Sequence, residues 1–128
     1  MSAVEYLIDT NILIYHTKGS EVVTNFISDI IAKQGFNLSI LTKIEFLGWD
    51  KHSSEGFQKC RQLIELANVY GLDEDIAEKA IELKRQSRIK LADAVIAATA
   101  IVNKFKLVTR NVDDYKVVNE LEVFNPFG

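Results

Sequence analysis

The sequence predicts an α/β domain of three layers, in which a central and mostly parallel sheet lies between two layers of helices (α/β/α). Short apolar stretches typical of strands alternate along the chain with amphipathic stretches typical of helices. One segment, LADAVIAATAI (91–101), has the composition of a helix that is buried on all sides. Acidic and polar residues directly follow several predicted strands, where ligands bind in parallel sheets.

The predicted strands are short, mostly apolar and bounded by turn residues. They cover 4–8, 37–40, 69–70, 106–109 and 121–124. Most of the connections between them are long enough to hold helices, so right-handed crossovers between parallel strands are the expected topology. We expect the first strand to lie at the centre of the sheet.

The intervening segments predict helices with one apolar face each. They cover 12–17 after a cap at Asn11, 20–35, 42 onward, 54–67, 73–89, 93 onward and a helical turn over 111–115. The second has the clearest apolar stripe, formed by Val23, Phe26, Ile27, Ile30 and Ile31. In the third helix, Ile44 and Leu47 are predicted to face inward.

Asp93 stands at the front of the segment predicted to be the buried helix. Alanine is the best helix former, and the run after Asp93 contains neither glycine nor proline, so we predict a helix that starts near Asp93. Aspartate is a preferred N-cap residue, which is one interpretation of this position. The other is that Asp93 is a functional carboxylate where a central helix emerges from the core.

Length and composition describe an ordinary globular chain. With 128 residues, 48% hydrophobic and 26% charged, residues 1–128 are expected to form one domain. The net charge of −3 does not attract polyanions to the chain as a whole, so such a partner would require a local basic patch or a bound cation. The single cysteine, Cys60, fits a reducing cytoplasm. Neither a secretory signal nor a membrane span is predicted.

Four carboxylates are expected to meet at one edge of the sheet. Asp9 ends the first strand and Asp93 begins the buried helix, while Glu45 and Asp114 lie just after the strands over 37–40 and 106–109. In a parallel sheet, the carboxyl ends of the strands and the N-termini of the following helices share one edge.

Each of these acids also has a local structural interpretation. Glu45 occupies the third position of a capping box opened by Thr42. Asp9 fits an Asx turn, and Asp114 can cap the turn that begins at Asn111. Capping does not explain why the acids should gather at one edge, where their repulsion disfavours the folded chain. A hard divalent cation removes that repulsion, and oxygen ligands select Mg²⁺ or Mn²⁺.

Four strings, in chain order, resemble those of a known family: LIDTNILIY, LTKIEFLG, LADAVIAATA and LVTRNVDDY. They resemble the PIN-domain ribonucleases, most closely the VapC toxins of bacterial toxin–antitoxin pairs, over nearly the whole chain. DTN is weakly specific, whereas DAVIAATA followed by TRN-x-x-D-[FY] is highly specific. The resemblance implies a Mg²⁺-dependent endoribonuclease that hydrolyses RNA phosphodiester bonds, is usually a homodimer and is held inactive by a cognate antitoxin protein.

The resemblance also implies roles for individual residues. Asp9, Glu45 and Asp93 match the acidic triad of the family. The position of the fourth acid varies within the family: in some members it matches Asn111, and in others it matches Asp114. We assign Asp114, with Asn111 as an outer contact of the site or the substrate. Two threonines and an asparagine match polar residues that support the site: Thr10, Asn11 and Thr109.

RNA cleavage needs an activated nucleophile and neutralisation of the charge that develops on phosphorus, and a metal ion supplies both. Asp9 and Asp93 are the expected metal ligands. Glu45 and Asp114 would orient water or hold a second ion, and the sequence is compatible with one ion or two. Among the basic residues, Arg110 is the best candidate for a substrate contact, because it lies between Thr109 and Asn111 at a strand end.

Two other classes fit parts of the pattern. A phosphoacceptor signalling domain also places acids and Mg²⁺ at the end of a parallel sheet, but such domains carry an adjacent acidic pair after the first strand, and here Asp9 is followed by Thr10 and Asn11. A PIN fold without catalysis, serving as a binding module, is the other alternative. The presence of all three triad acids argues against it. Metal-dependent RNA cleavage separates the three.

Overall fold

The computed structural model of the chain describes residues 4–128. Within them, five strands form one sheet in the order β3-β2-β1-β4-β5, and every pairing is parallel. The strands are β1 (Tyr6–Ile8), β2 (Phe36–Ser39), β3 (Asn68–Tyr70), β4 (Lys106–Val108) and β5 (Val123–Phe124). The predicted class, the parallel sheet and the central position of the first strand are therefore confirmed.

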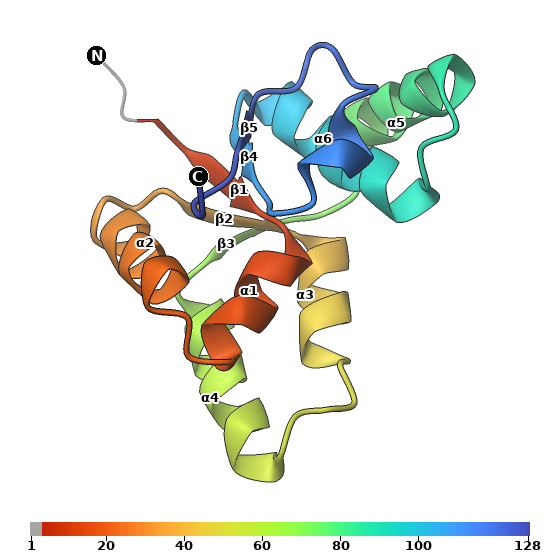
Figure 1. Cartoon of the computed structure of the whole chain (residues 1–128). Coiled ribbons are helices and arrows are strands. Elements are labelled where there is room, and N and C mark those ends of the chain that lie inside the picture. The colour runs from red at the N-terminus through yellow and green to blue at the C-terminus, as the bar shows by residue number, and fades with distance from the viewer. Residues whose placement is uncertain (1–3) are drawn as a thin grey trace.

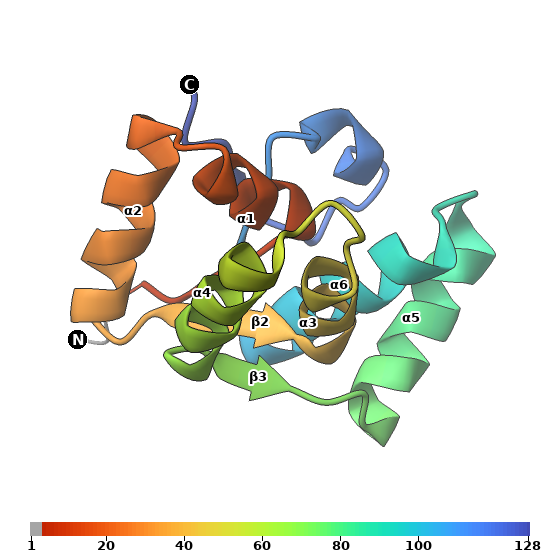
Figure 2. The same cartoon turned by 90° about the horizontal axis from the view of Figure 1, so that it is seen from below.

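Helices cover both faces of this sheet (Figures 1 and 2). They are α1 (Thr10–Thr17), α2 (Glu21–Ala32), α3 (Ile40–Leu47), α4 (Ser54–Glu65), α5 (Glu74–Gln86) and α6 (Leu91–Asn103), followed by the 3₁₀ turn η1 (Val112–Tyr115). One core joins the sheet to α1, α2, α4 and Phe46 of α3, and the other joins it to α5, α6 and η1. Leu7 belongs to one core and Ile8 to the other, because successive side chains of a strand point to opposite faces.

The helix α6 is buried along most of its length, as its composition predicts. Every residue from Ala94 to Ala100 is buried, between the sheet, α5 and η1. Its start differs from the prediction. The helix begins at Leu91 rather than Asp93, and the N-cap, Lys90, makes no side-chain capping bond. Asp93 is therefore a residue of the first turn, and its carboxylate is not used to cap the helix.

Two further helix starts differ from the prediction. The helix α1 begins at Thr10 and its N-cap is Asp9, not Asn11. The helix α3 begins at Ile40 and is capped by Ser39, whose hydroxyl accepts from the Leu41 N–H at 3.1 Å. Thr42 and Glu45 therefore form no capping box, and Glu45 lies in the second turn with its carboxylate free for another contact. Ile44, predicted to face inward, is 61% exposed, because α3 turns the face with Thr42 and Phe46 toward the core instead.

No helix within residues 4–128 combines the length and the apolar character that crossing a bilayer requires.

Candidate active site

The pairing of β1 with β4 places two polar residues side by side at the carboxyl edge of the sheet. Asp9 and Thr109 each follow the last residue of their strand, and Ile8 is in register with Val108. As a result, the Thr109 hydroxyl donates to Asp9 Oδ2 at 3.0 Å. This edge also receives the starts of α1, α3 and α6 and lies beside η1, so four segments that are far apart in the sequence meet around it (Figure 1).

Asp9 is a buried carboxylate, only 7% exposed. Its Oδ1 accepts the Thr10 backbone N–H at 2.9 Å. Its Oδ2 accepts three donors: Asn11 Nδ2 at 3.1 Å, and the hydroxyls of Thr109 and Tyr115, both at 3.0 Å. Burial raises the pKa of Asp9, and these hydrogen bonds only partly oppose the rise. The chain thus holds a carboxylate in a place where its charge is costly.

Asp93 faces Asp9 across the Tyr115 hydroxyl. Tyr115 Oη lies 3.3 Å from Asp93 Oδ1 and 3.0 Å from Asp9 Oδ2. A phenol has one hydrogen, so it donates to one of these carboxylates at a time. Partial burial raises the pKa of Asp93, and the negative charges of Asp114 and Glu45 raise it further. The other three predicted acids are therefore all close enough to influence Asp93 or to share a hydrogen-bond partner with it.

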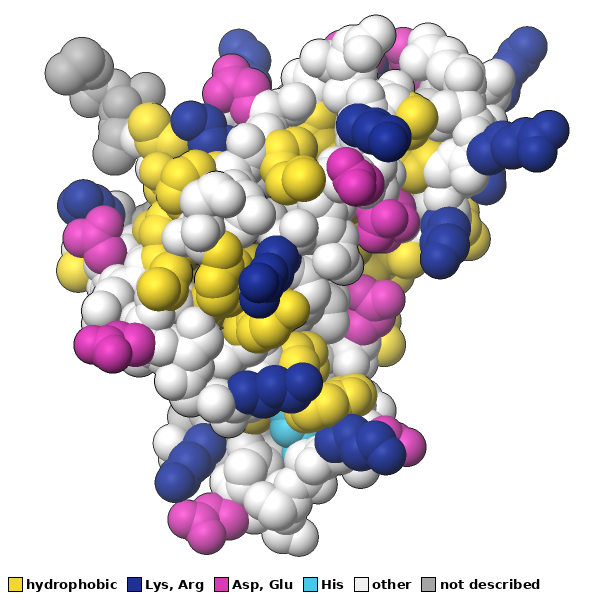
Figure 3. Space-filling view, in the orientation of Figure 1, with side chains coloured by type: hydrophobic (Ala, Val, Ile, Leu, Met, Phe, Trp, Pro, Cys, Tyr) yellow, Lys and Arg dark blue, Asp and Glu magenta, His cyan; other side chains and the backbone are white. Residues whose placement is uncertain are grey.

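Glu45 and Asp114 are both exposed, in contrast to Asp9. The Thr10 hydroxyl donates to Glu45 Oε1 at 2.7 Å, which ties α3 to the start of α1. Asp114 lies in η1 and interacts with Asp93 through space rather than through a hydrogen bond. Figure 3 shows acidic side chains over the region where α3, α6 and η1 meet, with Lys and Arg side chains to either side.

The predicted supporting residues form one hydrogen-bond network. Asn11 Nδ2 also donates to Thr109 Oγ1 at 3.0 Å, and Asn11 Oδ1 accepts the Arg110 backbone N–H at 3.0 Å. The Asn111 backbone N–H donates to Thr109 Oγ1 at 3.1 Å. Asn111 therefore joins the network through its backbone N–H, and the residue itself is exposed to solvent. The network fixes the segment after β4 against the segment after β1.

The side chain of Arg110 lies against two aromatic rings, although the residue is exposed. Its guanidinium carbon lies 4.2 Å from the ring centroid of Phe127 and 5.0 Å from that of Tyr15. The two rings pack edge to face, 5.1 Å apart. A cation held between aromatic rings keeps its charge and its N–H donors available.

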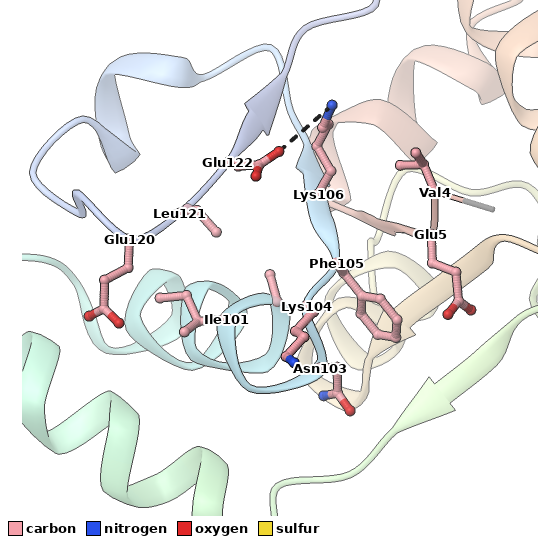
Figure 4. A pocket seen from close by; sticks show the side chains of 11 residues that line it. Val4, Glu5, Ile101, Asn103, Lys104, Phe105, Lys106, Glu120, Leu121 and Glu122 are labelled. Carbon is pink, nitrogen blue, oxygen red and sulfur yellow. Dashed lines mark ion pairs between the residues drawn. The ribbon is translucent and has the colours of Figure 1, made fainter. Parts of the chain in front are cut away.

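Four lysines illustrate how other basic residues are placed. Lys84 is used within the fold, since its Nζ donates to the Ile89 carbonyl at 2.8 Å. Lys90 lies near enough to Asp93 for its charge to lower the pKa of that carboxyl. Lys104 and Lys106 lie at the opposite edge, where the strands begin (Figure 4). They line a hollow of about 620 Å³ that contains none of the predicted site residues.

The carboxylate oxygens at the carboxyl edge are ligands of the kind that a hard cation prefers. Asp9 Oδ1 accepts one hydrogen bond and Asp93 Oδ2 accepts none from the described residues, so both retain lone pairs. Within residues 4–128, however, no three acidic, histidine or cysteine side chains are grouped tightly enough to enclose a metal ion. Asp9 and Asp93 form the inner pair, and Glu45 and Asp114 lie further out.

Tyr115 is the residue of this site for which the sequence reasoning gave no role. It is 2% exposed, and burial together with the charges of Asp9 and Asp93 raises the pKa of its hydroxyl far above the usual range. The sequence offers one signal for such a role, the aromatic residue directly after Asp114. Phenylalanine would supply the ring equally well, so a tyrosine at this position indicates that its hydroxyl has a use.

The fold and the acidic edge define a parallel α/β protein with a carboxylate site beyond its central strand. The chain belongs to the PIN domain family, whose model matches residues 6–120. A comparison with curated protein sequences finds no significant match.

Several solved structures are similar to this chain over nearly its whole length. A Klebsiella pneumoniae toxin-antitoxin complex contains a chain of 29% identity, with a TM-score of 0.76 over 95% of this chain and 98% of that one. The DNA-bound VapBC structure from Salmonella typhimurium has 16% identity and a TM-score of 0.85, over 97% and 99% of the two chains. FitAcB from Neisseria gonorrhoeae has 21% identity and a TM-score of 0.79, over 95% and 98%. The resemblance to PIN-domain toxins is therefore confirmed.

Proposed function

We propose that this protein is a metal-dependent endoribonuclease and the toxin of a toxin–antitoxin pair. One observation carries the catalytic part of the proposal. Asp9 and Asp93 approach the same buried hydroxyl, and none of the five ion pairs found within residues 4–128 includes either of them, Glu45 or Asp114. Four acids that form no ion pair with a described residue leave a negative site at one edge that a divalent cation can neutralise.

Asp9 and Asp93 would hold Mg²⁺, with Mn²⁺ as a substitute, and Glu45 and Asp114 would orient water or a second ion. When bound, the ion acidifies the attacking water and neutralises charge on the phosphoryl group. Burial and four hydrogen bonds hold Asp9 in one orientation, and the Thr10 hydroxyl holds Glu45. A carboxylate that is fixed before the substrate arrives does not reorganise during the reaction.

Arg110 would bind a phosphate of the RNA next to the cleaved bond. Its backbone N–H is fixed by Asn11, and its side chain lies against Tyr15 and Phe127 at the same edge as Asp9. Lys90, at the start of α6, would bind a phosphate on the other side of Asp93. These two cations would compensate locally for the net charge of −3, which does not favour RNA binding.

The activity is tested with the purified chain and a labelled RNA, in Mg²⁺ and in chelator. We expect cleavage in Mg²⁺ only, and its loss in Asp93→Asn, which keeps the side-chain shape while removing the charge. Asp29→Asn is the matched control, because Asp29 is an exposed aspartate whose only ion pair with a described residue is with Lys33, one turn further along. Equal cleavage in chelator, or by the Asp93→Asn variant, would reject the proposal.

A cognate antitoxin and a second copy of this chain are the proposed protein partners, by analogy with the toxin–antitoxin complexes named above. Phe46 of α3 is completely buried, so it cannot contribute to an apolar surface for either partner. Light scattering over a range of concentrations tests self-association. Inhibition of RNA cleavage by the product of an adjacent reading frame tests the antitoxin, and a chain that stays monomeric and has no such partner would contradict this part.

A further inference from the structure

The Tyr115 hydroxyl makes two contacts with described residues, and both are with carboxylates. It reaches Asp9 Oδ2 and Asp93 Oδ1 at 3.0 and 3.3 Å. These acids come from the end of β1 and the start of α6, whereas Tyr115 ends η1. Three segments that are far apart in the sequence therefore meet at one oxygen atom.

The ring of Tyr115 and its hydroxyl do different things. The ring belongs to the core formed with α5 and α6, where a phenylalanine would pack in the same way. The hydroxyl adds nothing to that packing, and burying it is unfavourable unless it is hydrogen-bonded. Its bonding partners lie entirely within the proposed site, so the reason for a tyrosine here must be sought in that site.

Asp9 and Asp93 depend on Tyr115 to different degrees. Asp9 has three other donors, from Thr10, Asn11 and Thr109. Asp93 has no other donor among the described residues, and its side chain is only partly buried. Without the hydroxyl, Asp9 would stay in place, whereas the Asp93 carboxylate would be free to rotate.

We propose that Tyr115 is a positioning residue that fixes Asp93 against Asp9, so that the remaining oxygens of both carboxylates face one divalent cation. Tyr115 donates to Asp9 Oδ2 or to Asp93 Oδ1, and in either case Asp9 Oδ1 and Asp93 Oδ2 keep free lone pairs. Groups that orient metal-binding side chains in this way raise metal affinity, because the ligands lose less freedom when the ion binds. This inference rests on the proposed metal site and assigns a role within it.

The direct test is Mg²⁺ binding, measured by calorimetry, to the wild type and to Tyr115→Phe. We expect the variant to bind Mg²⁺ at least about tenfold more weakly, the lower end of the range for outer groups of metal sites. Tyr70→Phe is the matched control, since Tyr70 packs against Phe105 beside the same core and its hydroxyl bonds to no described residue. It should bind Mg²⁺ as the wild type does.

RNA cleavage as a function of Mg²⁺ concentration gives a second readout. If Tyr115 acts by positioning Asp93, the variant needs more Mg²⁺ for half-maximal cleavage, and saturating Mg²⁺ restores most of the rate. A purely structural role would lower the melting temperature without moving this midpoint. Equal or tighter Mg²⁺ binding by Tyr115→Phe would overturn the inference, because the hydroxyl would then be neutral or a competitor for the carboxylates.

A measurement on the wild type keeps the inference testable if Tyr115→Phe does not fold. Mg²⁺ bound by Asp9 and Asp93 changes the charge beside the phenol, so titration with Mg²⁺ should change the near-ultraviolet absorbance of tyrosine. Saturable Mg²⁺ binding without such a change would overturn the inference and leave the proposed function intact. A wild type that neither binds Mg²⁺ nor cleaves RNA would reject the proposed function itself.

Discussion

The two edges of the sheet carry acids in different surroundings. Where the strands begin, Glu122 lies 3.8 Å from Lys106, and Glu120 lies 3.2 Å from Lys79 of α5. Where the strands end, Asp9 and Asp93 share a tyrosine hydroxyl and form no ion pair with a described residue. Glu122 and Glu120 are thus paired within the chain whereas Asp9 and Asp93 are not, as the proposed cation site requires.

The carboxyl edge has a cost in the absence of metal. Two like charges about 4 Å apart repel by about 1 kcal/mol in water and about 4 kcal/mol near a protein surface. Burial adds to this for Asp9, and proximity to Asp114 and Glu45 adds to it for Asp93. Proteins retain such local conflicts mainly at functional sites. Substitutions at the carboxyl edge should therefore have much larger consequences than substitutions at the edge where the strands begin.

The largest difference between the edges is expected in catalysis with Asp9→Asn. An asparagine can keep its oxygen on the three donors that now bond Oδ2, so the chain should still fold, as circular dichroism can verify. The lost charge should lower RNA cleavage in Mg²⁺ by more than about 100-fold, beyond the effect typical of outer groups around a metal. A folded variant with cleavage near the wild-type rate would remove Asp9 from the site.

The sequence was sufficient to predict most of the fold that positions these acids. Alternating apolar and amphipathic segments predicted the parallel sheet, and the alanine-rich run predicted the burial of α6. Helix starts were less accurate. Ser39 competes with Thr42 as a cap, and a local motif does not show which of two capping residues lies at the end of the strand.

Detailed contacts within the site were beyond what the sequence could predict. The predicted parallel sheet placed Asp9 and Thr109 at the same edge, but only the structure shows that β1 and β4 are neighbours and that the two residues are hydrogen-bonded. Nothing local to η1 indicates that the hydroxyl of Tyr115 reaches both Asp9 and Asp93, because that contact depends on how η1 packs against α6. The position of Arg110 between Tyr15 and Phe127 likewise depends on the path of the chain after β5.

A smaller effect, on stability, is expected for Asp93→Asn. Without metal, removal of this charge should raise stability by about 1 kcal/mol, the low end for a like-charge pair because Asp93 is partly exposed. This corresponds to roughly 3–5 °C in melting temperature for a domain of this size. Mg²⁺ at about 100 times its dissociation constant should stabilise the wild type by about 2.7 kcal/mol and the variant by less. A lower metal-free melting temperature for the variant would contradict this account.

The pH dependence of this stability difference follows from the raised pKa of Asp93. In the folded chain the carboxyl keeps its proton to higher pH than in the unfolded chain, where its pKa is about 3.9. Below about pH 4 the Asp93 carboxyl is protonated in both states and costs the folded chain no stability. As pH rises through the raised pKa of the folded state, this carboxyl ionises and the folded chain loses stability. The asparagine of the variant does not titrate, so the advantage of the variant should be absent near about pH 4 and grow toward neutrality. Melts in chelator across this range measure it, and a difference independent of pH would refute the charge explanation.

The smallest effect is expected at the edge where the strands begin, with Glu122→Gln. Glu122 is 78% exposed and lies 3.8 Å from Lys106, so the pair is screened by solvent. Its loss should change the free energy of unfolding by no more than about 0.5 kcal/mol. RNA cleavage and the stabilisation by Mg²⁺ should both remain at wild-type values, since no residue of the hollow in Figure 4 belongs to the carboxylate site. If Glu122→Gln reduced the stabilisation by Mg²⁺ as much as Asp93→Asn does, the ion would be acting on the overall negative charge of the chain. The difference between the two edges would then have no bearing on where the metal binds.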